Sequence, residues 1–327
     1  MKKILFYSVL LFITISSCKK DFSDEFTPYQ GVAFNDTTWT NEPISNSFID
    51  SLQSQIGLTN PFLNLFNPSL DTTVWLKNNI RIKIPGKSCV YQNNNLNAVT
   101  DSVQLKLIQI RKRGDFIRYM LSATSSQYPL VCASAFYVSY TSNNQPVSIL
   151  PTKPIIIQWQ DDDAVSGMQY YSGIPNSSAL YDINWQMDNT GTVSNWDTMM
   201  NGNHILGYTI QSTHSQWFSA GAPMDTSLGT TNLNVVLPLN FTNKNTLVFA
   251  VFNDVRSVLK LTPSAGEKGF YALHIPTNAN ITLVSISLIN NNLYVGTNVL
   301  YGINAGLQKL FPAKISPQAL NEFLNNL

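Results

Sequence analysis

Hydrophobic and polar residues alternate over short stretches along most of the chain. In the range 80–84, isoleucines alternate with Arg81 and Lys83, the pattern of a strand with one buried face, and the range 103–110 repeats it. Further strands are expected at 135–140, 155–159, 233–239, 246–252, 257–261, 270–275, 281–289 and 293–299. Turn residues separate nearly all of these segments at short intervals. The pattern predicts an all-β chain of two β-sandwich-like antiparallel domains.

Tight turns and helix caps refine this prediction. Asn78-Asn79 separates the segments 73–77 and 80–84, and because asparagine tolerates a positive φ, a hairpin with a two-residue turn is expected there. Ser316-Pro317 places a capping hydroxyl before a first-turn proline, and apolar residues follow it at helical spacing. A short C-terminal helix is therefore predicted, and the range 48–56 is a weaker candidate for another.

The order of these patterns suggests a division of the chain. We expect a signal peptide at 1–17, a tether at 18–30, a first β-sandwich domain at 31–160, a linker and irregular hairpin region at 161–204, a second β-sandwich domain at 205–312 and the C-terminal helix at 313–327. The boundary near 161 rests on the triple charge Asp161-Asp162-Asp163 directly after a strand.

The N-terminus has the composition of an export signal. Lys2-Lys3 precedes an apolar run, 4–15, that is too short to span a bilayer, and small residues follow it. Ile15-Ser16-Ser17-Cys18 resembles a bacterial lipobox, in which the cysteine is acylated and becomes the first residue of the mature chain. Each buried methylene of the lipid contributes about 0.8 kcal/mol, so several acyl chains anchor a protein durably. The alternative is an ordinary secretory signal with a coincidental cysteine.

The polar segment after Cys18 points to the cell surface. Lys20, Asp21, Asp24 and Glu25 stand where many surface lipoproteins of the Bacteroidetes carry Cys-Lys-Lys followed by acidic residues, and the leader and tether resemble theirs. The resemblance implies attachment to the outer membrane through the Cys18 lipid. It favours a position facing the cell exterior over the periplasmic face.

A second resemblance covers the range 80–159. It consists of Ile82-Lys-Ile-Pro85, the strand beginning at Val103, the turn Gly114-Asp115-Phe116-Ile117 and the return strand after Lys153-Pro154. These pieces resemble the ZU-type β-sandwich of ankyrins and netrin receptors, which also occurs in bacterial surface lipoproteins. That domain is an interaction and architectural module, so the resemblance implies binding or assembly without catalysis.

Composition excludes several partners. Charged residues are 12% of the chain, about half the usual share, and the net charge is +1. Because nucleic acids attract clustered Lys and Arg, no nucleic-acid partner is expected. After the signal, no apolar stretch reaches the length of a membrane span.

Two cysteines remain once Cys18 carries lipid. An exported chain meets an oxidising compartment, where leftover cysteines commonly pair. We therefore expect a Cys89–Cys132 disulfide, which would contribute about 4 kcal/mol in the chain-entropy model. Two separately buried thiols are the alternative.

The sequence contains no recognised catalytic, nucleotide-binding or metal-binding motif. Gly86-Lys87-Ser88 lacks the first glycine of a phosphate-binding loop, since position 81 is an arginine. The three histidines have no His, Cys or Glu at metal-ligand spacing, so no metal and no cofactor are expected. We predict that the chain is not an enzyme; a hydrolase with an unrecognised aspartate site, for example Asp182 with Asp188, remains an alternative.

Two clusters of charged residues are interpreted as solvent-exposed segments. Asp161-Asp162-Asp163 lacks the spacing of a calcium loop and is interpreted as a solvated linker. Arg111-Lys112-Arg113 with Arg118 is interpreted as a solvated loop after a strand, in preference to a ligand site.

Tryptophans offer a candidate glycan platform, because exposed aromatic faces stack on sugar rings. Trp75 and Trp159 fit strand patterns and are expected in the core. Trp196 and Trp217 lie in stretches of polar residues and are the better candidates for an exposed platform.

Four segments resemble the Asp-(Ser/Thr)-apolar site at which Bacteroidetes O-glycosylate exported proteins. The acceptor residues would be Thr37, Thr72, Ser102 and Thr198.

Together these features favour a non-catalytic, lipid-anchored cell-envelope protein that acts in binding, adhesion or assembly, with envelope proteins or glycans as partners. A glycan-binding accessory lipoprotein of an outer-membrane uptake system is the alternative, and the hydrolase is a second one.

Overall fold

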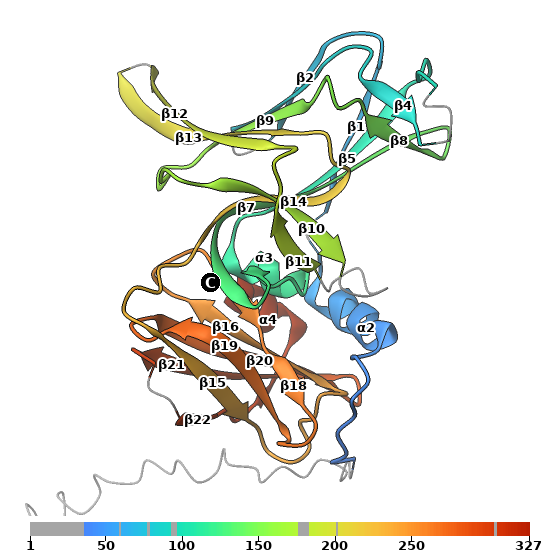
Figure 1. The fold of residues 1–327 in the computed structure, drawn as a ribbon. Helices are drawn as coiled ribbons and strands as arrows, with labels where there is room; N and C mark the ends of the chain where they lie inside the picture. The colour runs from blue at the N-terminus through green and yellow to red at the C-terminus, as the bar shows by residue number, and fades with distance from the viewer. Residues whose placement is uncertain are drawn as a thin grey trace, which may run out of the picture. The chain divides into compact units, whose positions relative to one another are not determined.

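The computed structural model describes residues 36–58, 60–76, 79–92, 97–175, 183–200, 202–303 and 306–327. The range 37–327 forms one compact unit (Figure 1). Strand accounts for 54% and helix for 9%, the sheets are largely antiparallel, and a short helix ends the chain. The all-β fold class predicted from the sequence is therefore confirmed.

The N-terminal part of this unit contains two facing sheets. The first has nine strands, with the path β1-β5-β7-β14-β10-β11 and with β4, β6 and β8 at its side. Their bounds are β1 Phe62–Phe66, β4 Cys89–Tyr91, β5 Val103–Ile110, β6 Thr124–Ser125, β7 Tyr128–Ser142, β8 Gln145–Ile149, β10 Gln169–Pro175, β11 Ile183–Met187 and β14 Gln216–Pro223.

The second sheet has five strands in the order β12-β13-β9-β3-β2. Their bounds are β2 Thr72–Leu76, β3 Ile80–Ile84, β9 Ile155–Gln160, β12 Thr192–Met200 and β13 Asn203–Ser212. Trp159 is fully buried between the sheets and contacts Phe136 of β7 and Tyr208 of β13.

The C-terminal part contains another pair of sheets. One has the order β18-β19-β15-β22 and the other β17-β16-β20-β21-β23. Their bounds are β15 Thr230–Val236, β16 Thr246–Phe252, β17 Val258–Lys260, β18 Thr262–Ser264, β19 Gly269–Pro276, β20 Asn280–Ile289, β21 Asn292–Tyr301, β22 Gly306–Lys309 and β23 Ala313–Ile315. The β15–β22 pair is parallel.

Within one strand, the side chains of neighbouring residues pack in different hydrophobic clusters. Phe218 of β14 packs in the cluster between the first two sheets, whereas its neighbour Trp217 packs in a cluster on the opposite face. In β16, Phe249 shares that second cluster, while Val248 packs between the two C-terminal sheets. Because strand side chains alternate between faces, two of the sheets are covered on both sides.

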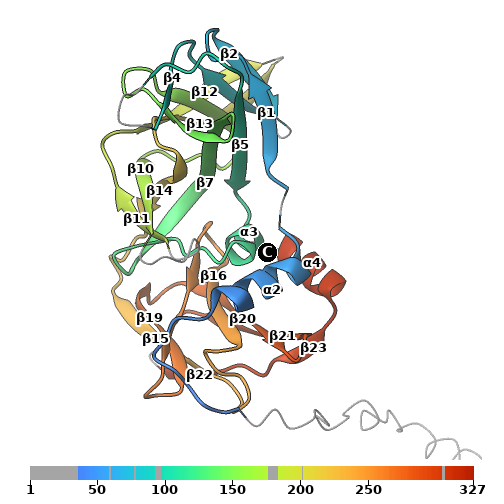
Figure 2. The same cartoon turned by 90° about the vertical axis from the view of Figure 1, so that its right-hand side faces the viewer.

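Three helices lie in the layer between β7 and β16 (Figures 1 and 2), where their apolar residues join the shared cluster. They are α2 Asn46–Ile56, α3 Arg113–Arg118 and α4 Pro317–Asn325. Ser45 and Ser316 cap α2 and α4 by accepting hydrogen bonds from backbone amides, as capping hydroxyls do. Both helices predicted from the sequence are thus present, but residues 313–315, expected in the C-terminal helix, form β23 instead. Helix α3 was not anticipated.

The domain boundaries differ from the predicted ones. The range 161–204, expected to be a linker and irregular hairpin region, contributes β10, β11 and β12 to the two N-terminal sheets. The strands β13 and β14, expected in the second sandwich, pair with β9 and β7 of the first. Polar residues are frequent in β12, which suggested a loop, although Tyr208 and Ile210 of β13 alternate with Thr209 and Gln211 and face the core.

Gly114 lies where α3 crosses α4 closely. A Cβ atom at this position would lie 1.8 Å from the backbone oxygen of Leu324 in α4. The absence of a side chain therefore allows the two backbones to approach.

We predict that Gly114→Ala lowers the free energy of unfolding by about 2 kcal/mol, because a backbone atom gives way less than a side chain does. Helix propensity alone predicts the opposite, a gain of about 1 kcal/mol. Urea unfolding followed by tryptophan fluorescence measures the change. Gly266→Ala is the matched control, since nothing lies within 4 Å of the added Cβ there; a stabilised Gly114→Ala variant contradicts the prediction.

Candidate binding cleft

A cleft of about 1470 Å³ opens where β2, β5 and β9 end. Trp75 and Asn79 line one side of it, and Gln160 lies at the end of β9. Arg111 follows β5, and Arg256 comes from the segment between β16 and β17. Stretches that are far apart along the chain thus converge on one concave surface.

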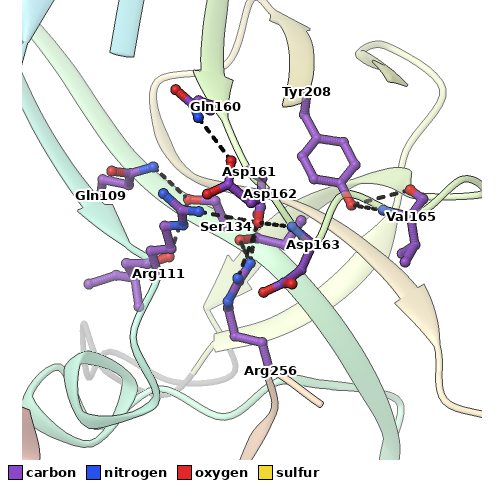
Figure 3. A network of polar contacts seen from close by, with 12 residues as sticks. Gln109, Arg111, Ser134, Gln160, Asp161, Asp162, Asp163, Val165, Tyr208 and Arg256 are labelled. Carbon is purple, nitrogen blue, oxygen red and sulfur yellow. Dashed lines mark hydrogen bonds and ion pairs between the residues drawn. The ribbon is translucent and has the colours of Figure 1, made fainter. Parts of the chain in front are cut away.

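Asp161 is the charged centre behind this surface (Figure 3). Its carboxylate is 1% exposed and lies 2.9 Å from Nη1 of Arg256 and 3.2 Å from Nη2 of Arg111. Arg256 also donates to the carbonyl oxygen of Ala133 on β7, at 2.6 Å. Asp161 therefore joins the end of β9 to the end of β5 and to the β16–β17 segment.

Burial alone would raise the pKa of Asp161. The hydrogen bond and positive charge of Arg256, together with the charge of Arg111, outweigh it and lower this pKa below its ordinary value of 3.8. The expected solvated linker at 161–163 is thus wrong for Asp161, whereas Asp162 and Asp163 are exposed.

A chain of amide hydrogen bonds runs along the wall of the cleft. Asn79 Nδ2 donates to Gln160 Oε1 at 2.8 Å, and Gln160 Nε2 donates to Asp162 Oδ1 at 2.8 Å. Nearby, the hydroxyl of Tyr208 accepts from the amide of Val165 at 2.7 Å (Figure 3). The wall therefore presents fixed, planar polar groups.

The basic segment after β5 is structural, contrary to the expected solvated loop. Arg113 donates to the carbonyl oxygens of Asn253, Val255 and Leu327, at 2.6, 3.2 and 3.1 Å. Burial and then the charge of Arg256 lower the pKa of Arg113. Only Lys112 of the triplet is exposed.

Arg118 is buried among the three helices. It donates to the carbonyl oxygen of Ile56 at 3.2 Å, to Asn325 Oδ1 at 2.9 Å and to Asn321 Oδ1. Arg118 thus provides hydrogen-bond donors for the last carbonyl groups of α2 and holds α4 beside it. These bonds also give the buried guanidinium the acceptors that a buried charge requires.

The tryptophans are distributed differently from the prediction. Trp217 is 9% exposed and packs against Tyr119 and Tyr137, so it belongs to the core and not to a platform. Trp196 is half-buried over Gly207 and donates from Nε1 to the carbonyl oxygen of Tyr208. Trp159 is in the core as expected.

Trp75, expected in the core, is 66% exposed. The observed register pairs Trp75 with Arg81, whereas a two-residue turn at 78–79 would pair it with the inward-facing Ile82. A shift of one residue moves every side chain of a strand to the other face. The exposed aromatic side chain of the cleft is therefore one that the sequence assigned to the interior.

Cys89 and Cys132 are both buried free thiols, the alternative to the predicted disulfide. Cys89 packs in the cluster between the first two sheets and Cys132 in the cluster on the helical side. The nine-stranded sheet separates them. Burial raises the pKa of both thiols, that of Cys132 to about 12.

Other candidate residues do not converge on a site. His214 Nε2 lies 3.5 Å from Asp188, and His204 Nε2 lies 2.6 Å from Asp197 on the exposed β12–β13 hairpin. In the described part of the chain, no group of three or more His, Cys, Asp or Glu residues is placed to hold a metal ion. Cys18 and Asp182 lie outside the described residues.

The four predicted O-glycosylation acceptors are all described. Ser102 and Thr198 are exposed, and Thr37 and Thr72 are half-buried. Their modification stays a prediction.

Comparisons with known proteins found no match among family models, curated proteins or solved structures. Within the described ranges, no helix is both long and apolar enough to cross a membrane.

We predict that Asp161→Asn lowers the free energy of unfolding by about 3 kcal/mol at neutral pH, because it leaves two partly buried arginines without their anion. Since the pKa of Asp161 is lower in the folded state, its stabilisation is complete above 3.8 and is lost as the pH falls through the folded value. Urea unfolding at neutral and at strongly acid pH measures the difference.

Asp163→Asn is the control for that comparison, because it removes an adjacent exposed carboxylate. Equal stability of the two variants at neutral pH would contradict a structural role for Asp161.

Proposed function

We propose that this chain is a non-catalytic, lipid-anchored protein of the cell envelope, and that the cleft is the surface with which it binds a partner in adhesion or assembly. The observation that carries the proposal is the cleft itself, a concave surface with fixed polar groups and one exposed aromatic ring. Such surfaces are the usual form of a binding site.

Three aspartates of the described chain have pKa values unlike those of a general acid. A general acid that works near neutral pH has a raised pKa, as a buried carboxyl without a cation does. The pKa values of Asp161, Asp188 and Asp225 are all lowered. Partial burial alone would raise the pKa of Asp188, but hydrogen bonds from Thr190 and the charge of His214 outweigh burial and lower this pKa. The proposed hydrolase therefore gains no support from them.

The N-terminal sequence supports the anchor. The apolar run 4–15 followed by Cys18, and the resemblance of the leader and tether to those of Bacteroidetes surface lipoproteins, favour the outer membrane and its exterior face. The resemblance of 80–159 to ZU-type modules favours interaction as the role of the folded part.

Replacing Cys18 tests the anchor. We expect an alkaline carbonate wash to release Cys18→Ala, but not the unchanged protein, from the membrane fraction of cells, since the acylated side chain is lost and binding through the cleft is reversible. Fractionation and immunoblotting measure the distribution. Ser17→Ala is the control and keeps the protein in the membrane fraction; an unchanged distribution of Cys18→Ala overturns the lipid anchor.

Filling the cleft tests its role. We expect the unanchored Cys18→Ala protein to co-sediment with isolated envelope fragments, and Asp162→Trp in that background to reduce the bound fraction at least fivefold. Asp162 is exposed and lines the cleft, so the indole occupies space that a partner needs.

Thr226→Trp in the same background is the matched control, because Thr226 is exposed and lies outside the cleft lining. Co-sedimentation that the two substitutions reduce equally, or that Asp162→Trp leaves unchanged, contradicts the proposal.

A further inference from the structure

Trp75 is held in an exposed position on an edge strand. β2 is the last strand of its sheet, and the ring of Trp75 projects from the face that also carries Arg81. A tryptophan side chain offers 150–250 Å² of surface, roughly, most of which other tryptophans of this chain bury. Trp75 keeps 66% of its surface exposed and lines the cleft, so its ring is accessible to a ligand there.

The ring is also fixed in place. The guanidinium carbon of Arg81 lies 5.4 Å from the ring centroid, a cation–π contact. Arg81 is itself held by Gln158, whose Oε1 accepts from Arg81 Nε at 2.8 Å. Among the described residues, Arg81 is the one cation over this ring, so it covers one face and leaves the opposite face for a ligand.

The polar groups beside Trp75 suit hydroxyl groups. Asn79 and Gln160 are joined in one hydrogen-bonded chain with Asp162, which fixes their orientation. Within the described ranges, no hydrogen bond uses the second hydrogen of either amide, Asn79 Oδ1 or the second oxygen of Asp162. Sugar hydroxyls both donate and accept, and they match this mixture of groups.

The charges of the cleft favour a neutral ligand. Its lining residues include four cations, Arg111, Lys112, Arg113 and Arg256, and four carboxylates, Asp115, Asp162, Asp163 and Asp254. This balance attracts neither polyanions nor polycations. The volume of about 1470 Å³ exceeds that of ordinary small-molecule sites, about 300–1,000 Å³, and accommodates an oligomer.

We propose that the cleft binds a neutral oligosaccharide, with one sugar ring stacked on the face of Trp75 opposite Arg81 and its hydroxyls bonded to Asn79, Gln160 and Asp162. This inference rests on the proposed role of the cleft as a binding surface. Trp75, and not the expected pair Trp196 and Trp217, is then the aromatic residue on which a sugar stacks.

Titration of oligosaccharides tests the inference. The detergent-solubilised full chain is titrated by calorimetry with neutral hexasaccharides of glucose, xylose, mannose and galactose. Oligomers of hyaluronan and chitosan provide anionic and cationic comparisons. We expect at least one neutral hexasaccharide to bind, Trp75→Ala to weaken its binding at least tenfold and Trp75→Phe to retain most of it.

Tyr301→Ala is the matched control, because Tyr301 is 82% exposed and lies outside the cleft lining. Binding that is equally weak in Trp75→Ala and Tyr301→Ala overturns the inference, as does binding of a charged oligomer alone or of none. Thermal unfolding of each variant confirms that it is folded.

Failure of this inference and failure of the proposed function give different results. If Asp162→Trp abolishes co-sedimentation with envelope fragments while no neutral hexasaccharide binds, the cleft binds a partner of another class and the inference is wrong. If Asp162→Trp leaves co-sedimentation unchanged, the proposed function itself is wrong.

Discussion

The arrangement of this protein depends on one buried charge. The Asp161 carboxylate is withdrawn from water at the end of β9, and taking it from water costs several kcal/mol unless cations replace the lost hydration. Arg111 and Arg256 supply them from segments 50 and 95 residues away along the chain. Because both arginines must reach the same carboxylate, the ends of β5 and β9 and the β16–β17 segment are held together, and the cleft forms over this point.

The layered sheets set the surroundings of that charge. Neighbouring residues of β14 and β16 enter different clusters, so each of these strands supports two cores. The helices fill the layer between them, where Arg118 satisfies the end of α2 and holds α4. The same layering explains why Cys89 and Cys132 remain thiols, since a sheet lies between their clusters.

Local patterns predicted much of the fold. The strand expected at 246–252 is β16 with the same bounds, and the Ser316-Pro317 cap begins α4 where expected. These elements depend on alternation or capping within a few residues, which the chain displays directly. The β12–β13 hairpin was missed, although Tyr208 and Ile210 of β13 face the core, because the many polar residues of β12 are typical of a loop.

The sequence by itself determined the all-β class, the capped helices and the N-terminal features that predict an anchor, because each of these depends on residues adjacent in the chain. Only the tertiary structure decided the site. Trp75 reaches the cleft through a register shift of one residue, and Asp161 finds Arg256 across 95 positions. Strand register and distant ion pairs are set by how whole sheets pack, and no short stretch of sequence contains that information.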